Sequence, residues 1–157
     1  MNTIASDNPF SKEETETLAT LVGMMIPAST KYDVPGADDD TILTEIISTA
    51  RQNSETIVEG LKALEAEAQR EHNAPFPGLT HDVRMSIVEQ FQETSQRLMA
   101  NITAITVQCY YRDPRVMESL GMEARPPYPE GFELEQGDWS LLDPVRDRGK
   151  IWRDVTG

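Results

Sequence analysis

The sequence has only one cysteine and no long apolar run. A single cysteine among 157 residues excludes an internal disulfide framework and a multi-cysteine zinc site. Cys109 lies among apolar residues at helical spacing, so a small buried core residue is favoured over a reactive thiol. No apolar stretch reaches the roughly 18 to 20 residues needed to cross a bilayer, so we expect no membrane insertion.

Basic residues are also scarce. Fourteen Lys and Arg stand against 27 Asp and Glu, for a net charge of −13. Phosphate backbones and anionic lipid surfaces would be repelled, so binding to nucleic acid or a membrane surface is disfavoured. The opening residues MNTIASDNPFSKEE contain no basic region, apolar core or arginine pair of an export signal. We therefore expect a cytoplasmic chain, or one carried elsewhere by a partner.

Residues that carry chemistry are few. There is no G-x-G-x-x-G phosphate cradle, P-loop, C-x-x-C or H-E-x-x-H motif. His72 and His81 are the only histidines, both near expected helix ends, where surface histidine is common. The aspartates at 38–40 lack the donor spacing of a calcium loop and suit the start of a helix. We predict no catalytic, cofactor-binding or metal-binding residues and no cofactor in this chain.

Helical periodicity dominates the first 121 residues and predicts a mainly α, irregular bundle of about five helices with additional short ones. Residues 1–10 are expected to be a loose lead-in, and Ser11 with Glu14 has capping-box spacing. Val34-Pro35-Gly36 is typical of a tight turn. Thr80 is expected to cap the fourth helix. The first three predicted helices lie near residues 12–26, 40–52 and 54–72. A fourth carries Val83, Ile87, Val88 and Phe91, and a fifth runs from about residue 95 to Tyr110.

The half of the third helix written EAEAQREH is interpreted as a solvated helix end. The fifth helix is unusually apolar, with Leu98, Met99 and Ile102 on one stripe, which predicts a central place in the bundle.

The segment CYYRDPRVMESLG at 109–121 is the most specific part of the chain. Asp113 is a good N-cap, Pro114 suits the first helical position, and Gly121 stands where a helix-ending glycine belongs. We predict a short helix at 114–120. Tyr110 or Tyr111 could fill the end of the bundle while Arg112 pairs with a nearby carboxylate, or the cluster at 110–113 could bind another protein.

Residues 122–157 lack periodicity and are rich in proline and aromatic residues. A disordered tail is usually poor in tryptophan, yet this segment holds both tryptophans of the chain. It repeats the Asp-Pro pair at Asp143-Pro144, with Gly149 closing a turn. We predict one domain with a bundle at 11–121 and an ordered arm at 122–157. Tyr, Trp and Arg are typical interface anchors, and the predicted partner interface comprises Tyr110, Tyr111, Arg112, Asp113, Pro114, Tyr128, Phe132, Trp139 and Trp152.

The chain resembles the gluconate 2-dehydrogenase subunit 3 family. The resemblance rests on LVGMMIPASTKYDVPGADD at 21–39, CYYRDPRVMESLG at 109–121 and the tail. It implies a helical, non-catalytic small subunit that binds a large FAD-dependent dehydrogenase of the glucose-methanol-choline type. In that family the large subunit holds FAD and oxidises a sugar or polyol hydroxyl, and a cytochrome c subunit often takes the electrons onward.

In that family the small subunit commonly supports folding, stability or export of its partner. Members often carry a twin-arginine signal, which is absent here, so a cytoplasmic complex acting on a sugar or glycoside is expected. Two alternatives stay open. One is a stand-alone enzyme that uses His72 or His81, and the other is a self-associating helical module.

Overall fold

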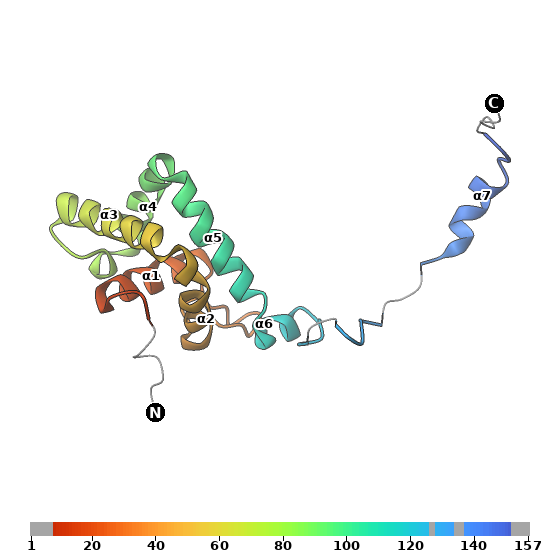
Figure 1. Ribbon diagram of the computed structural model, residues 1–157, viewed down its shortest axis with the longest axis horizontal. Coiled ribbons are helices and arrows are strands. Elements are labelled where there is room, and N and C mark those ends of the chain that lie inside the picture. The colour runs from red at the N-terminus through yellow and green to blue at the C-terminus, as the bar shows by residue number, and fades with distance from the viewer. Residues whose placement is uncertain (1–7, 126–127, 134–136, 152–157) are drawn as a thin grey trace. The chain divides into compact units, whose positions relative to one another are not determined.

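A computed structural model describes residues 8–125, 128–133 and 137–151. The chain divides into two units, Met1–Arg125 and Pro126–Gly157, and each is described by itself. All regular elements in the described ranges are helical, with one isolated bridge between Ser29 and Val34 (Figure 1). The predicted mainly α class is therefore confirmed.

The helices lie close to their predicted positions. In the part of the chain that the structure describes, no helix is long and apolar enough to span a membrane. The α-helices of the first unit are α1 (Lys12–Met25), α2 (Asp40–Ala50), α3 (Ser54–His72), α4 (His81–Thr94), α5 (Gln96–Tyr110) and α6 (Pro114–Ser119), with short 3-10 helices η2 (Arg51–Asn53) and η3 (Phe76–Gly78) between them.

The predicted capping box at the start of α1 is present. The Ser11 hydroxyl accepts from the Glu14 amide at 3.2 Å, and the Glu14 carboxylate accepts from the Ser11 amide at 2.8 Å. The residues just before it are not the loose lead-in that we expected, because Phe10 is buried in the core. Thr80 does stand at the N-cap of α4, but its side chain makes no capping hydrogen bond there.

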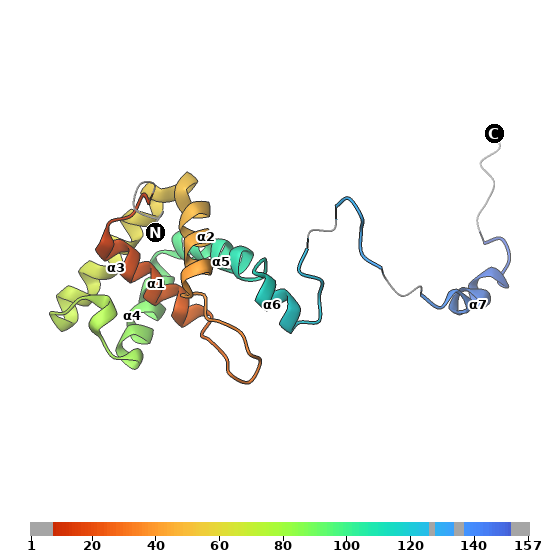
Figure 2. The same cartoon turned by 90° about the horizontal axis from the view of Figure 1, so that it is seen from below.

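The loop between α1 and α2 turns earlier than predicted (Figure 2). Ser29 and Val34 exchange two backbone hydrogen bonds of 3.0 and 3.1 Å, and Asp33 rather than Gly36 takes the positive φ, 53°. Gly36 is needed for space: a Cβ there would lie 2.3 Å from Oδ1 of Asp38 and 3.0 Å from the Ala28 nitrogen. The glycine therefore permits a close approach of side chain and backbone, not an unusual dihedral.

The central position predicted for α5 is confirmed. This helix packs against α1, α2, α3 and α4, and Leu98, Met99 and Ile102 are buried. Gly60 of α3 makes room for it, since a Cβ there would overlap Leu98. Every buried apolar residue that the structure describes lies between Phe10 and Val116, so the described core belongs to the first unit.

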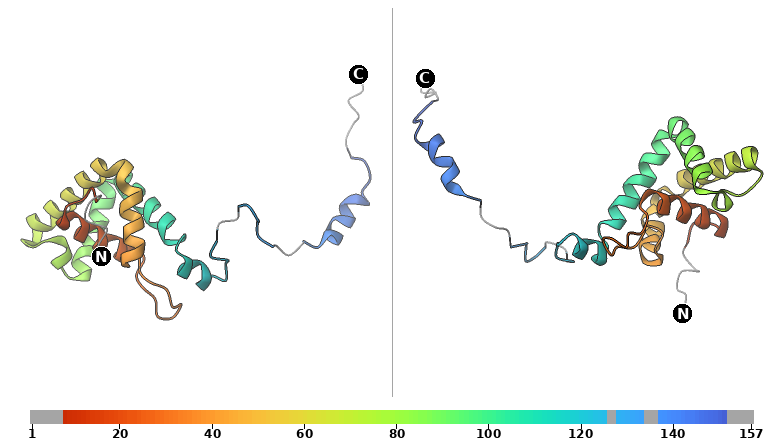
Figure 3. Two further views of the ribbon diagram at one scale, coloured as in Figure 1. Left: turned by 60° about the horizontal axis from the view of Figure 1, so that its bottom comes forward. Right: turned by 180° about the vertical axis from the view of Figure 1, so that it is seen from behind.

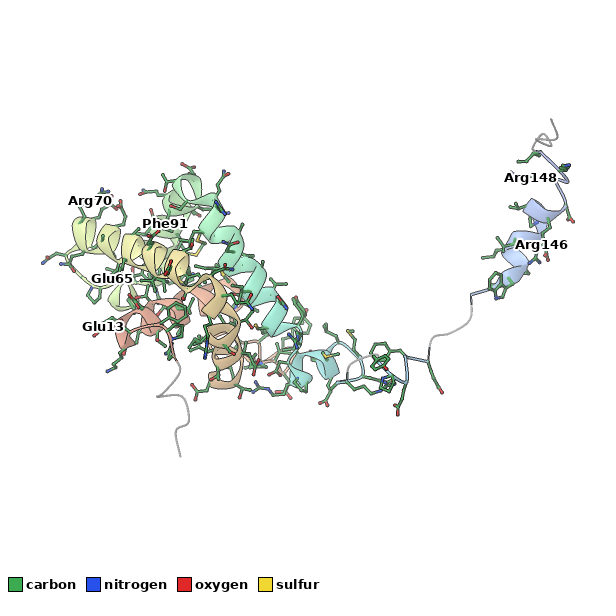
Figure 4. The ribbon with its side chains drawn as sticks, in the orientation of Figure 1. Glu13, Glu65, Arg70, Phe91, Arg146 and Arg148 are labelled. Carbon is green, nitrogen blue, oxygen red and sulfur yellow. The ribbon has the colours of Figure 1, made fainter. Side chains whose placement is uncertain are left out.

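The second half of α3 is more than a solvated end. Glu65 (labelled in Figure 4) accepts from the Phe76 amide at 3.1 Å and from the Thr17 hydroxyl at 3.3 Å, and Ala68 is fully buried. The carboxylate therefore ties α3 to α1 and to η3. The prediction of a solvated segment missed this because an acidic helix end usually faces water.

The described residues of the second unit, 128–133 and 137–151, contain one short helical stretch. The 3-10 helix η4 (Trp139–Leu142) continues into α7 (Asp143–Arg146), which carries Arg146 and precedes Arg148, both labelled in Figure 4. Asp138 caps this stretch by accepting from the Ser140 amide at 3.0 Å, so Asp143 lies inside the helical stretch and is not its cap. Gly149 has a positive φ of 69°, as a turn-closing glycine would.

Candidate partner interface at the corner between α5 and α6

The corner where α5 gives way to α6 is held by one arginine between two aspartates. Arg115 donates to the Asp113 carboxylate from Nε and from an Nη atom, each at 2.9 Å. Its Nη atoms also donate to both carboxylate oxygens of Asp39, at 2.7 and 3.1 Å. Because Asp39 caps α2 and Asp113 caps α6, the guanidinium joins the starts of two helices far apart in sequence.

Electrostatics favour the ionised state of all three groups. Hydrogen bonds from Arg115 lower the pKa of Asp113 and of Asp39, against the opposing effect of burial. The same hydrogen bonds raise the pKa of Arg115. The Asp113 side chain is only 5% exposed, so its negative charge is stabilised mainly by Arg115 and little by water. The Arg115 side chain is 45% exposed.

The two tyrosines of the corner have different roles. Tyr110 is buried and donates its hydroxyl proton to the Pro35 carbonyl at 3.1 Å, which fastens the loop between α1 and α2 to the end of α5. Burial raises the pKa of Tyr110, with smaller contributions from Tyr111 and Asp113. Tyr111 stacks edge-to-face on Tyr110 at 5.3 Å but is 52% exposed.

Helix α6, the short helix that follows α5 in Figure 3, is closed by Gly121, as the position of that glycine predicts. Gly121 has a φ of 73°, its amide donates to the Glu118 carbonyl at 2.9 Å, and the Met122 amide donates to Met117 at 3.0 Å. This pair of bonds is a Schellman motif. It ends α6 after six residues.

A hollow of about 280 Å³ lies beside the corner. Thr41 and Glu45 of α2 form one wall, and Arg112 and Pro114 are on the other. Tyr111, Arg112 and Pro114 are all exposed, and we name these three residues the corner surface. An exposed aromatic ring and a guanidinium beside a hollow suit contact with another protein.

The predicted interface residues thus divide into two groups. Tyr110 and Asp113 are buried and serve the fold, while the corner surface faces outward. Our structural interpretation had assigned the carboxylate partner to Arg112; within the described residues Arg115 makes those ion pairs instead. The missed signal is local, because an arginine two residues after an N-cap aspartate can reach back to its carboxylate. Cys109 is buried as predicted, with its sulfur 3.5 Å from the Thr49 hydroxyl.

The remaining predicted interface residues belong to the second unit. Tyr128, Phe132 and Trp139 are 86%, 37% and 64% exposed. Trp152 lies outside the described residues. None of the described residues of this unit is buried, so its aromatic side chains have no core of their own.

The two histidines stand at the end of α3 and at the start of α4. His81 lines a cavity with residues of α1, whereas His72 ends α3 and lies 3.9 Å from the Glu71 carboxylate. Within the described ranges no group of three or more His, Cys, Asp or Glu is placed to hold a metal ion.

Comparison with known proteins identifies the first unit. The family described as Gluconate 2-dehydrogenase subunit 3 matches residues 12–126, which include two of the three segments that carried the resemblance, 21–39 and 109–121. The tail beyond residue 126 lies outside this match. No curated protein and no solved structure matches the chain. The chain belongs to the gluconate 2-dehydrogenase subunit 3 family, whose members are small subunits of dehydrogenase complexes.

Proposed function

We propose that this chain is a non-catalytic accessory subunit that binds and stabilises, or helps to mature, a large FAD-dependent dehydrogenase of the glucose-methanol-choline type. The large subunit would hold FAD and oxidise a sugar, polyol or glycoside hydroxyl. A cytochrome c subunit could take the electrons onward. Family membership and the exposed corner surface support this division of labour.

The corner surface is the observation that carries the proposal. Tyr111, Arg112 and Pro114 need no partner inside the fold, since Tyr110, Asp113 and Arg115 already hold the corner. Their backbone is fixed by the end of α5 and the start of α6, so binding would order few additional groups. A backbone that is already ordered lowers the conformational entropy lost on association.

The second unit offers a second contact region. Its exposed Tyr128, Phe132 and Trp139 are residue types that dominate binding energy at interfaces. Because this tail lies outside the family match, we propose that it adds contacts specific to the partner of this chain.

Co-expression with the candidate dehydrogenase, followed by size-exclusion chromatography, tests the proposal. We expect one peak that contains both chains and the visible absorbance of FAD. Two separate peaks, together with a lone large subunit that is fully stable and active, would show that the proposal is wrong.

A matched pair of tyrosine variants tests the surface. Tyr111→Ala should weaken the complex by about 10-fold or more, because truncating an aromatic anchor typically costs about 2 kcal/mol. Tyr32→Ala is the control, since Tyr32 is an exposed tyrosine of the loop between α1 and α2 outside the predicted interface. Equal effects of the two variants would argue against the corner surface. The cytoplasmic location stays a prediction that cell fractionation would test.

A further inference from the structure

A second cavity lies away from the corner surface and shares no residue with it. Its volume is about 440 Å³, within the range of small-molecule sites. Helix α1 contributes Thr20 and Gly23, the following loop contributes Pro27 and Asp38, and α4 contributes His81 and Arg84. The proposed function uses none of these residues.

Arg84 in this cavity lacks a partner. Its Nε is fully buried and has no hydrogen-bond acceptor among the described residues, and no described carboxylate lies within ion-pair distance of it. This is unexpected in a chain whose acidic residues outnumber its basic ones by 27 to 14. A buried donor without an acceptor is costly, and a guanidinium matches the two oxygens of a carboxylate.

Asp38 faces the same cavity but is held apart from Arg84. Its carboxyl group packs where a side chain on Gly23 would stand, 2.9 Å from that Cβ position, and also over Gly36. The two glycines therefore leave room for this carboxylate beside α1. The cavity thus has a negative group on one wall and, on another, a guanidinium without a partner among the described residues.

We propose that this cavity binds a carboxylate group through Arg84. His81, the first residue of α4, also lines the cavity, and the amide dipoles at this helix start favour a negative charge, although Asp82 in the same turn opposes it. Asp38 repels the ligand and confines the carboxylate to the Arg84 side. The carboxylate belongs either to a small free acid or to an acidic side chain of a partner protein.

The Nε–H resonance of Arg84 in the ¹⁵N-labelled full chain gives the direct test. Titration with acetate, at constant ionic strength set by chloride, should shift this resonance to saturation. Arg84→Gln should weaken acetate binding about 10-fold or more, the loss expected for a charge-assisted hydrogen bond. Arg97→Gln is the control, because Arg97 is an exposed arginine with no ion pair among the described residues.

Asp38→Asn provides a test of opposite sign. Removal of the like charge should strengthen acetate binding severalfold while the fold is retained, which circular dichroism would check. Arg84→Lys should bind with intermediate affinity, since it keeps the charge but loses the Nε donor.

A second arm distinguishes the two sources of carboxylate. Saturable acetate binding that depends on Arg84 identifies a free acid. If acetate does not bind but Arg84→Gln weakens the complex with the large subunit, and Arg97→Gln does not, the carboxylate is a side chain of that subunit. This second outcome also requires the proposed function. No effect of Arg84→Gln in either arm would overturn the inference and leave the proposed function untouched.

Discussion

Replacement of Arg115 by methionine should destabilise the isolated chain far more than the same replacement of its neighbour Arg112. Arg115 bridges Asp39 and Asp113, whereas Arg112 makes no ion pair among the described residues. Methionine keeps most of the aliphatic stem and removes the guanidinium. The comparison therefore isolates the loss of the charged bridge.

The expected magnitude follows from the exposure of the three side chains. Removing one partner of a buried ion pair costs about 3 to 5 kcal/mol. The cost here is smaller, because Asp113 keeps the hydrogen bond from the Arg115 amide and Arg115 is 45% exposed. The Asp39 side chain is 27% exposed, so loss of its ion pair with Arg115 lowers the free energy of unfolding by about 0 to 1 kcal/mol. We expect a total loss of about 2 to 3 kcal/mol for Arg115→Met and less than about 0.5 kcal/mol for Arg112→Met.

Urea unfolding followed by circular dichroism would measure both values. Adding Asp113→Asn to Arg115→Met should restore part of the loss, because asparagine still caps α6 and no charge is left buried. Equal stabilities of Arg115→Met and Arg112→Met would refute the assignment of the bridge to Arg115.

Three further predictions concern pH and two glycines. The pKa values of Asp39 and Asp113 are lowered on folding, so their contribution is present above about pH 4 and is lost as the pH falls through the folded pKa values; urea unfolding between neutral and acid pH should show this loss, and a flat profile would contradict it. Gly60→Ala should cost about 1 to 3 kcal/mol despite better helix propensity, because its Cβ would lie 1.7 Å from Cδ2 of Leu98; a gain in melting temperature would show that Leu98 moves aside freely. Gly121→Ala should cost about 1 kcal/mol from its φ of 73° alone, since no atom lies within 4 Å of the new Cβ, and an unchanged melting temperature would argue against the Schellman geometry.

The elements that the sequence predicted well depend on local chemistry. Ser11 with Glu14, and Asp113 with Pro114 and Gly121, act within a few residues of chain, so their spacing alone determines where helices begin and end. The apolar stripe of α5 likewise predicted that this helix is buried, because an apolar helix face packs against other elements of the fold.

Apart from the local pair of Arg115 with Asp113, the features that were missed depend on contacts between distant segments. Asp39 and Arg115 are 76 residues apart, and Thr17 and Glu65 are 48 apart, so neither spacing carries a helical signal. Gly36 was predicted as part of a tight turn, whereas the close approach of the Asp38 side chain explains why glycine stands there. The burial of Tyr110 and the exposure of Tyr111 were also not predicted, because adjacent residues at a helix end can face opposite environments. Which tyrosine is buried depends on the contact of Tyr110 with the distant Pro35.

Association with the flavoprotein is the central claim of this account. The most direct measurement is the dissociation constant of the full chain with the purified large subunit, compared between the wild type and Tyr111→Ala. We predict a stoichiometric complex that retains FAD, with affinity reduced about 10-fold or more by the variant and unchanged by Tyr32→Ala. The absence of binding by the wild-type chain would contradict the account.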